Sequence, residues 1–168
     1  MNLDFVYTPS FDADRFIDGR RISFFNPLAG EITGRGQPLQ VDRRQSWFRD
    51  DEISARLYRR FGSVEAALYG YRGYWKSPGG FDIQSGQATF PRLAVYGGSL
   101  RGPLLSGIAN LEVGYYDSRD DRSGDNPLVR NSEFRALAGY ERELMSNFTI
   151  GMKYYVEQLL DYGDFRRA

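Results

Sequence analysis

The residues that could do chemistry are limited by two absences, because the chain contains no histidine and no cysteine. Neither a Ser-His-Asp triad nor a histidine-ligated metal can be built, and there is no thiolate nucleophile and no disulfide. Glutamates remain, and a pair of carboxylates can cleave a glycosidic bond. Nothing in their spacing singles out one such pair. We therefore expect a protein that is not an enzyme.

A second candidate is the loop at 117–126, in which several carboxylates lie close together. Calcium is the cation that such oxygens would bind, but the ligand order of an EF-hand, with its terminal glutamate, is missing. Arginines alternate with the aspartates, so the charges of the loop cancel. The glycine-rich segments 34–36, 79–80 and 97–98 do not follow a strand that leads into a helix, so phosphate binding has no support. We expect neither a metal nor a cofactor.

The remaining charged residues lie in segments that alternate with the two-residue period of a β-strand. The clearest are 133–141 and 148–157, which are separated by a short polar break and predict an antiparallel hairpin. Five further segments alternate in the same way. The predicted strands are Asn2–Thr8, 51–60, 64–75, 92–99, 108–117, 133–141 and 148–157.

These strands have one face without charge and one face with many charges. Leu57, Leu68, Leu111, Ile150 and Met152 lie on the predicted uncharged face, together with Leu93, Val95 and Gly97. A basic residue that faces lipid costs roughly 2–4 kcal/mol at the membrane midplane, so a transmembrane barrel must segregate its charges in this way. The predicted charged face, which would line the lumen, carries Glu52, Arg56, Glu65, Arg92, Glu112, Glu133, Arg135, Glu141, Lys153 and Glu157.

The predicted lumen charges could form pairs across the strands, Arg56 with Glu65 and Arg92 with Glu112. Arg135 or Lys153 could likewise approach Glu157 or Glu141. In a wide barrel such rows line an aqueous path and set its ion or solute preference. The alternative is a salt-bridged network that only holds the wall together, since the interior is polar in either case.

The connections between the predicted strands alternate in length. Those at 60–63, 100–106 and 142–147 are short, and those at 9–50, 76–91 and 118–130 are long. Short turns on one side and long loops on the other are typical of outer-membrane barrels. Aromatic residues near the strand ends fit interfacial girdles, although those of 69–75 could also stack on sugars or bases. The girdle candidates are Tyr74, Trp75, Tyr115, Tyr140, Phe148 and Tyr154.

Composition agrees with a β-rich membrane protein. The formal net charge is zero, from 22 basic and 22 acidic residues, so there is no general electrostatic case for binding nucleic acid. Aromatic residues make up 15% of the chain, with 19 glycines, which suits strands better than helices. Mean hydropathy is −0.53, and no apolar run approaches the 18 or more residues of a membrane helix. The lack of cysteine fits an oxidising envelope compartment.

Four strings of the sequence carry a resemblance to a known family: FVYTPSFDADRFIDGRRISFFNP, YGYRGYWKSPGG, GGSLRGPLLSGIANLEVGYYDSRDDRSGDNPLVRNSEFR and AGYERELMSNFTIGMKYYVEQLLDY. They resemble Gram-negative outer-membrane β-barrels of the porin-like kind, most closely the large barrels. The resemblance covers nearly the whole chain and rests on strand-and-turn patterning. It implies a location in the bacterial outer membrane, lipid around the barrel and small hydrophilic solutes within it.

The chain departs from a complete member of that family in three respects. It has about seven strands where bacterial single-chain barrels have an even number, it opens without a signal peptide, and it ends without an aromatic strand. We therefore expect 1–168 to be one partial domain, an incomplete antiparallel transmembrane β-barrel with a long loop at 9–50. Its edge strands, Asn2–Thr8 and 148–160, would need the missing strands or further copies of the chain as partners.

The expected function is a porin-like channel for passive diffusion of small hydrophilic solutes. Two alternatives stay open. A non-conducting structural or surface-interaction barrel would have a lumen closed by paired arginines and glutamates. A soluble barrel that binds an apolar ligand would turn the uncharged face inward, gathering Leu57, Leu68, Leu111, Ile150 and Met152 in a dry centre.

Overall fold

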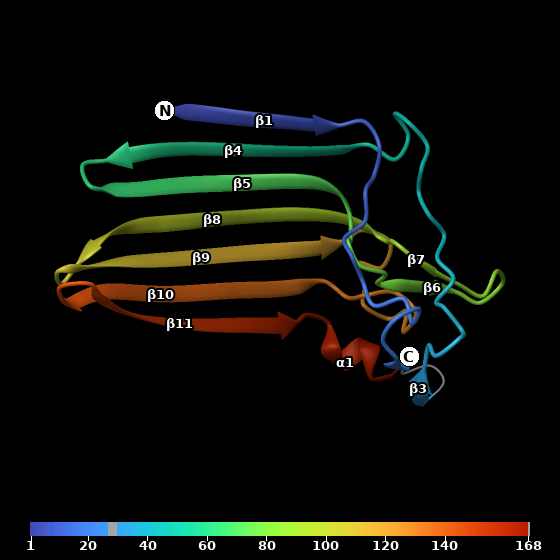
Figure 1. The fold of residues 1–168 in the computed structure, drawn as a ribbon. Helices are drawn as coiled ribbons and strands as arrows, with labels where there is room; N and C mark the ends of the chain where they lie inside the picture. Colours follow the sequence, from blue (N-terminus) through green and yellow to red (C-terminus); the bar gives the residue numbers. More distant parts are fainter. Residues whose placement is uncertain (27–29, 168) are drawn as a thin grey trace.

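The computed structural model describes residues 1–26 and 30–167 and is all-β apart from one short helix. Its main element is a seven-stranded antiparallel sheet with the order β1-β4-β5-β8-β9-β10-β11 (Figure 1). The predicted β class, antiparallel pairing and strand number are confirmed. The sheet is open, with β1 and β11 as its two edges. The strands are β1 (Asn2–Thr8), β4 (Glu52–Phe61), β5 (Val64–Tyr74), β8 (Arg92–Leu104), β9 (Gly107–Ser118), β10 (Glu133–Met145) and β11 (Phe148–Leu159).

Two-residue turns join the strands at one end of the sheet, which we call the turn end. The sequence-based turns at 100–106 and 142–147 are therefore too long. Pro103 still faces Ile108 in the β8–β9 ladder, so glycine and proline in this stretch do not end the strand. The turn residues Leu105 and Ser106 both have positive φ, 46° and 62°, which is the geometry of a hairpin turn that follows the sheet's own twist.

The long connections all gather at the opposite end, which we call the loop end (Figure 1). They form two small antiparallel ribbons, and a helical turn follows β11; the sequence analysis assigned none of these. No helix in the described part of the chain is long and apolar enough to cross a membrane. Residues 27–29 of the expected loop 9–50, and Ala168, lie outside the described residues. The small elements are β2 (Phe24–Asn26) with β3 (Glu31–Thr33), β6 (Gly80–Asp82) with β7 (Gln87–Thr89), and α1 (Tyr162–Phe165).

We call the long connections gathered at the loop end the cap. The hydrophobic core lies in the cap, because the sheet is a single layer and no second layer of the described structure covers either of its faces. Phe11 packs against Tyr74 and Phe90 with ring centroids 5.4 and 5.0 Å apart. The loop between β1 and β4 is also tied down through its backbone, since Ala88 donates to the carbonyl of Gln40 and accepts from Asp42, both at 2.9 Å. The cap is thus packed and hydrogen-bonded.

The strand register defines two faces of the sheet. On the uncharged face, cross-strand neighbours such as Leu57 and Leu68, or Leu100 and Leu111, stand next to one another. Leu68 is 64% exposed and Met152 is 77% exposed, so these residues do not gather in a dry centre. Among the described strand residues, charges on this face occur only close to the strand ends: Arg59, Arg72, Arg92, Asp117 and Arg142.

The register reverses the predicted faces of β8. Gly97 lies between Tyr69 and Gly114, so Leu93, Val95 and Gly97 belong to the charged face. Arg92 consequently lies on the other face, and its predicted place beside Glu112 is wrong. The prediction failed because apolar and small residues occupy both faces of β8, and the single charge that decided it stands at the first position of the strand.

Candidate functional site

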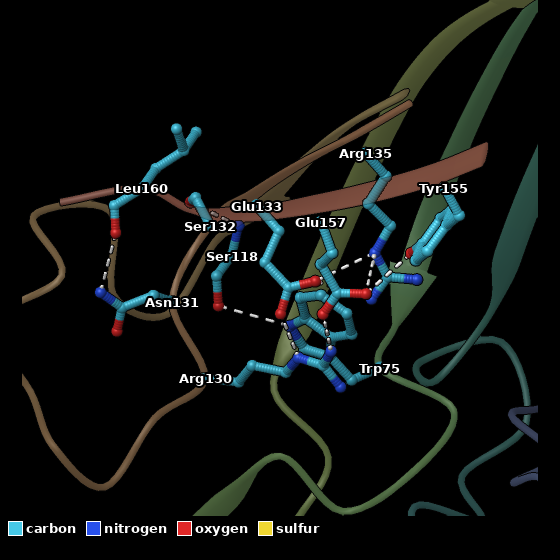
Figure 2. A network of polar contacts seen from close by, with 10 residues as sticks. All are labelled: Trp75, Ser118, Arg130, Asn131, Ser132, Glu133, Arg135, Tyr155, Glu157 and Leu160. Atoms are coloured by element: carbon cyan, nitrogen blue, oxygen red, sulfur yellow. Dashed lines mark hydrogen bonds and ion pairs between the residues drawn. The ribbon is translucent and has the colours of Figure 1, made fainter. Parts of the chain in front are cut away.

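Four ionised side chains form one network on the charged face, where β10 and β11 reach the loop end (Figure 2). One oxygen of Glu133 accepts a hydrogen bond from Arg130 Nε at 2.6 Å, and the other accepts from Arg135 Nη2 at 2.6 Å. Glu157 lies 3.6 Å from Arg130 and 3.5 Å from Arg135. Each arginine therefore contacts both glutamates.

The register explains how these residues meet. Glu133 opens β10, Arg135 follows on the same face, and Glu157 is the direct partner of Arg135 on β11. Arg130 approaches from the loop that precedes β10. Glu133 is only 3% exposed, and a buried carboxylate is tolerated only when donors satisfy its oxygens. The two guanidiniums meet this requirement and also cancel the charge of the network.

Aromatic rings close the network on one side. The Arg130 guanidinium lies 4.2 Å from the ring centroid of Trp75, and Arg135 lies 4.2 Å from that of Tyr116. The two rings stack at 5.9 Å, and the indole nitrogen of Trp75 donates to Ser118 Oγ at 3.4 Å. Stacking of arginine on aromatic rings adds to stability where water is excluded. The end of β5 is thereby joined to β9 and β10.

A second cluster joins the cap to the charged face on β4. Glu52, which is buried, accepts hydrogen bonds from Lys76 Nζ at 2.6 Å and from the Tyr71 hydroxyl at 2.5 Å. Lys76 also donates to the backbone carbonyl of Asp12 at 3.0 Å. One lysine thus joins the loop that follows β1 to the loop that follows β5.

A third cluster lies nearer the turn end. Arg56 is paired with Glu65 at 2.7 Å, and its guanidinium lies 4.2 Å from the ring of Tyr58 and 5.8 Å from that of Tyr69. The Arg56–Glu65 pair is one of those expected from the sequence. It couples β4 to β5 on the charged face.

The structure forms some of the expected pairs and not others. Arg135 does approach Glu157, whereas Arg92 pairs with Asp120 at 2.6 Å in place of Glu112. Glu141 has a partner that was not expected, Arg101 at 3.6 Å. Of the ten residues predicted for the charged face, nine lie on it and Arg92 does not. Two of the nine, Glu112 and Lys153, form no ion pair in the described structure. The nine are Glu52, Arg56, Glu65, Glu112, Glu133, Arg135, Glu141, Lys153 and Glu157. Whether that face lines a lumen stays a prediction.

Several residues of the clusters were missed by the sequence analysis. Lys76 and Arg130 lie in loops, where no alternation assigns a face. Trp75 and Tyr74 were expected at an interfacial girdle, yet both are buried in the cap. Arg101 was placed in a turn because the predicted strand ended at residue 99, whereas β8 continues to Leu104.

In the acidic loop at 117–126, aspartate side chains bind backbone N–H groups and arginine side chains of the same loop. Asp121 accepts hydrogen bonds from the N–H groups of Gly124 and Asn126 at 3.1 and 3.0 Å, and Asp117 pairs with Arg122 at 3.4 Å. In residues 1–26 and 30–167, no three acidic side chains are grouped so that they could hold a metal. The carboxylates therefore act as turn caps and ion-pair partners.

These clusters can hold neighbouring strands and loops together and place charge along one face of the sheet. Comparison with known proteins adds no relative: no family, curated protein or solved structure matches the chain.

Proposed function

We propose that the chain forms part of the wall of an outer-membrane channel through which small hydrophilic solutes diffuse passively. One observation carries the proposal: an exposed, uncharged band lies along one face of the sheet and is bounded by charged residues near both strand ends. The opposite face holds most of the charged strand residues, including those in the middle of the strands. This is the arrangement that lipid on one side and water on the other require.

The energetics support covering the uncharged face. Removing a leucine or phenylalanine side chain from water is worth about 1.5–3 kcal/mol, and this face exposes many. A soluble sheet would cover it with helices or a second sheet, and the described residues supply neither. Lipid is the covering that we propose.

Strand length supports the same partner. β9 and β11 each contain 12 residues. At about 3.3 Å per residue and a tilt of about 45°, such a strand spans about 28 Å, close to the roughly 30 Å of a bilayer's hydrocarbon core. Closure of the ring would require strands besides the seven described, either further segments or further copies of the chain.

A second candidate is a barrel that does not conduct. It is favoured by the network of Arg130, Glu133, Arg135 and Glu157, whose charges cancel and whose members are held by one another. Reconstitution of the full-length protein in planar bilayers separates the two, because stepwise conductance is expected only of the channel.

Two arginine substitutions test the orientation of the faces. Leu68→Arg places a charge in the middle of the uncharged face, and Leu137→Arg places one beside Glu112 on the charged face. In phospholipid vesicles we expect Leu68→Arg to cost about 2–4 kcal/mol of folding free energy and Leu137→Arg less than about 1 kcal/mol. Equal effects, or a protein that stays dispersed without detergent, would refute the proposal.

A further inference from the structure

A hollow on the charged face contains a carboxylate that the chain does not neutralise. It spans β5, β8, β9, β10 and β11 and has a volume of about 360 Å³. Gly97 and Gly114, which face one another across β8 and β9, form its floor, and Tyr69, Glu112 and Tyr116 stand around it.

The glycine pair is what makes the hollow. A Cβ at Gly97 would lie 2.9 Å from the carbonyl oxygen of Val113, and one at Gly114 would lie 3.1 Å from the ring of Tyr116. Any side chain at these positions would displace its neighbours and fill the space. The space above the two positions is therefore open because both residues are glycine, and the ring of Tyr116 occupies part of that space.

Glu112 is free to bind something from outside. Its cross-strand neighbours are Ser99 and Leu137, and no hydrogen bond or ion pair to it occurs in the described structure. Arg135, the cation that lines the same hollow, already donates to Glu133 and lies 3.5 Å from Glu157. The hollow therefore retains one uncompensated negative charge.

The charged face of the sheet as a whole is also negative. The described strands place more acidic than basic side chains on it, and the two loop cations that reach it, Lys76 and Arg130, are bound to Glu52 and Glu133. Lys153, which is also unpaired, lies two strands from Glu112. The acidic residues are Asp4, Glu52, Glu65, Glu112, Glu133, Glu141, Glu143 and Glu157, and the basic ones are Arg56, Arg60, Arg101, Arg135 and Lys153.

We propose that this hollow binds solutes that carry an organic ammonium group, with Glu112 as counter-ion and Tyr69 and Tyr155, which line the same hollow, as aromatic walls. A cavity of this size accepts a small organic cation, and a carboxylate beside aromatic rings is the chemistry that recognises one. The inference rests on the proposed channel, for which it names the preferred solute class. Glu112 becomes the residue that sets charge preference.

The test compares Glu112→Gln with Glu31→Gln in the full-length protein. Both remove one negative charge, but Glu31 lies on β3 in the cap. Tetramethylammonium is the probe, and its binding to protein in detergent micelles is followed by saturation-transfer NMR. We expect Glu112→Gln to weaken binding about five-fold, the effect of one charge at about 4 Å in water, and Glu31→Gln to leave it unchanged.

A second measurement separates this inference from the proposed function. In planar bilayers, cation-over-anion permeability should fall in Glu112→Gln and not in Glu31→Gln. A conducting protein whose two variants behave alike overturns the hollow as a cation site and leaves the channel standing. Binding that depends on Glu112 in a protein without conductance overturns the channel and supports the hollow.

Discussion

Replacement of Glu133 by glutamine should destabilise the fold far more than the same replacement at Glu157. Glu133 is buried and accepts two charge-assisted hydrogen bonds at 2.6 Å, from Arg130 and Arg135. Such bonds contribute about 1.5–3 kcal/mol each. Glutamine keeps one acceptor oxygen, and both guanidiniums keep Glu157 and some contact with water. We therefore expect Glu133→Gln to lower the free energy of unfolding by about 2–4 kcal/mol.

Glu157→Gln is the matched control. Its side chain is 41% exposed and its ion pairs measure 3.5 and 3.6 Å, so we expect a loss of less than about 1 kcal/mol. The assay is urea unfolding in detergent micelles, followed by the fluorescence of Trp75 in a Trp47→Phe background, because Trp47 is exposed. Equal losses for the two variants, or a loss below about 1 kcal/mol for Glu133→Gln, would contradict the role given to buried charge.

Three further changes probe the cap. Phe90→Ala should cost about 3–5 kcal/mol and open the loop 9–50 to protease, whereas Ile83→Ala, at an exposed position, should change stability by less than about 0.5 kcal/mol. Trp75→Ala should cost about as much as Phe90→Ala and raise the mobility of Arg130, as NMR relaxation would show. The hydrogen bond from the Ser85 hydroxyl, and to a smaller extent that from the Gln84 N–H, holds the pKa of Asp82 below its ordinary value. The Ser85–Asp82 hydrogen bond therefore stabilises the cap at pH values above the pKa of Asp82 in the unfolded state. This stabilisation is lost as pH falls through the lowered pKa of the folded state. Ser85→Ala should raise that pKa in an NMR titration, and an unchanged titration would refute the assignment.

The strands could be read from the sequence where their faces differ in chemistry. In β9, Asn110, Glu112 and Tyr116 alternate with Leu111 and Val113, and the expected faces agree with the register. In β8 the contrast is too weak, and pairing with β5 and β9 decides the face instead. Tertiary pairing is information that the alternation of one segment does not contain.

Of the residues in the three clusters, only those that lie in strands could be predicted from the sequence. A direct cross-strand pair such as Arg135 with Glu157 follows from a short turn, because a tight hairpin leaves few registers. Arg56 reaches Glu65 diagonally, since the register partner of Glu65 is Arg60. Arg130, Lys76 and Trp75 enter from long connections, whose path depends on how the cap packs around Phe11 and Phe90. Their roles follow from tertiary packing, which has no local signature in the sequence.

Strand direction restricts how the open sheet can be completed. Each antiparallel step reverses direction, and the order of the sheet puts six steps between β1 and β11, so both edges run toward the loop end (Figure 1). Two copies placed side by side around a common axis would meet through parallel contacts, which are somewhat less stable per residue. A ring that keeps every neighbour antiparallel must gain an odd number of strands, whose outermost members point away from the loop end. A second copy has the required odd number of strands, seven, but around that axis its own edge strands run toward the loop end, so it cannot close an all-antiparallel ring.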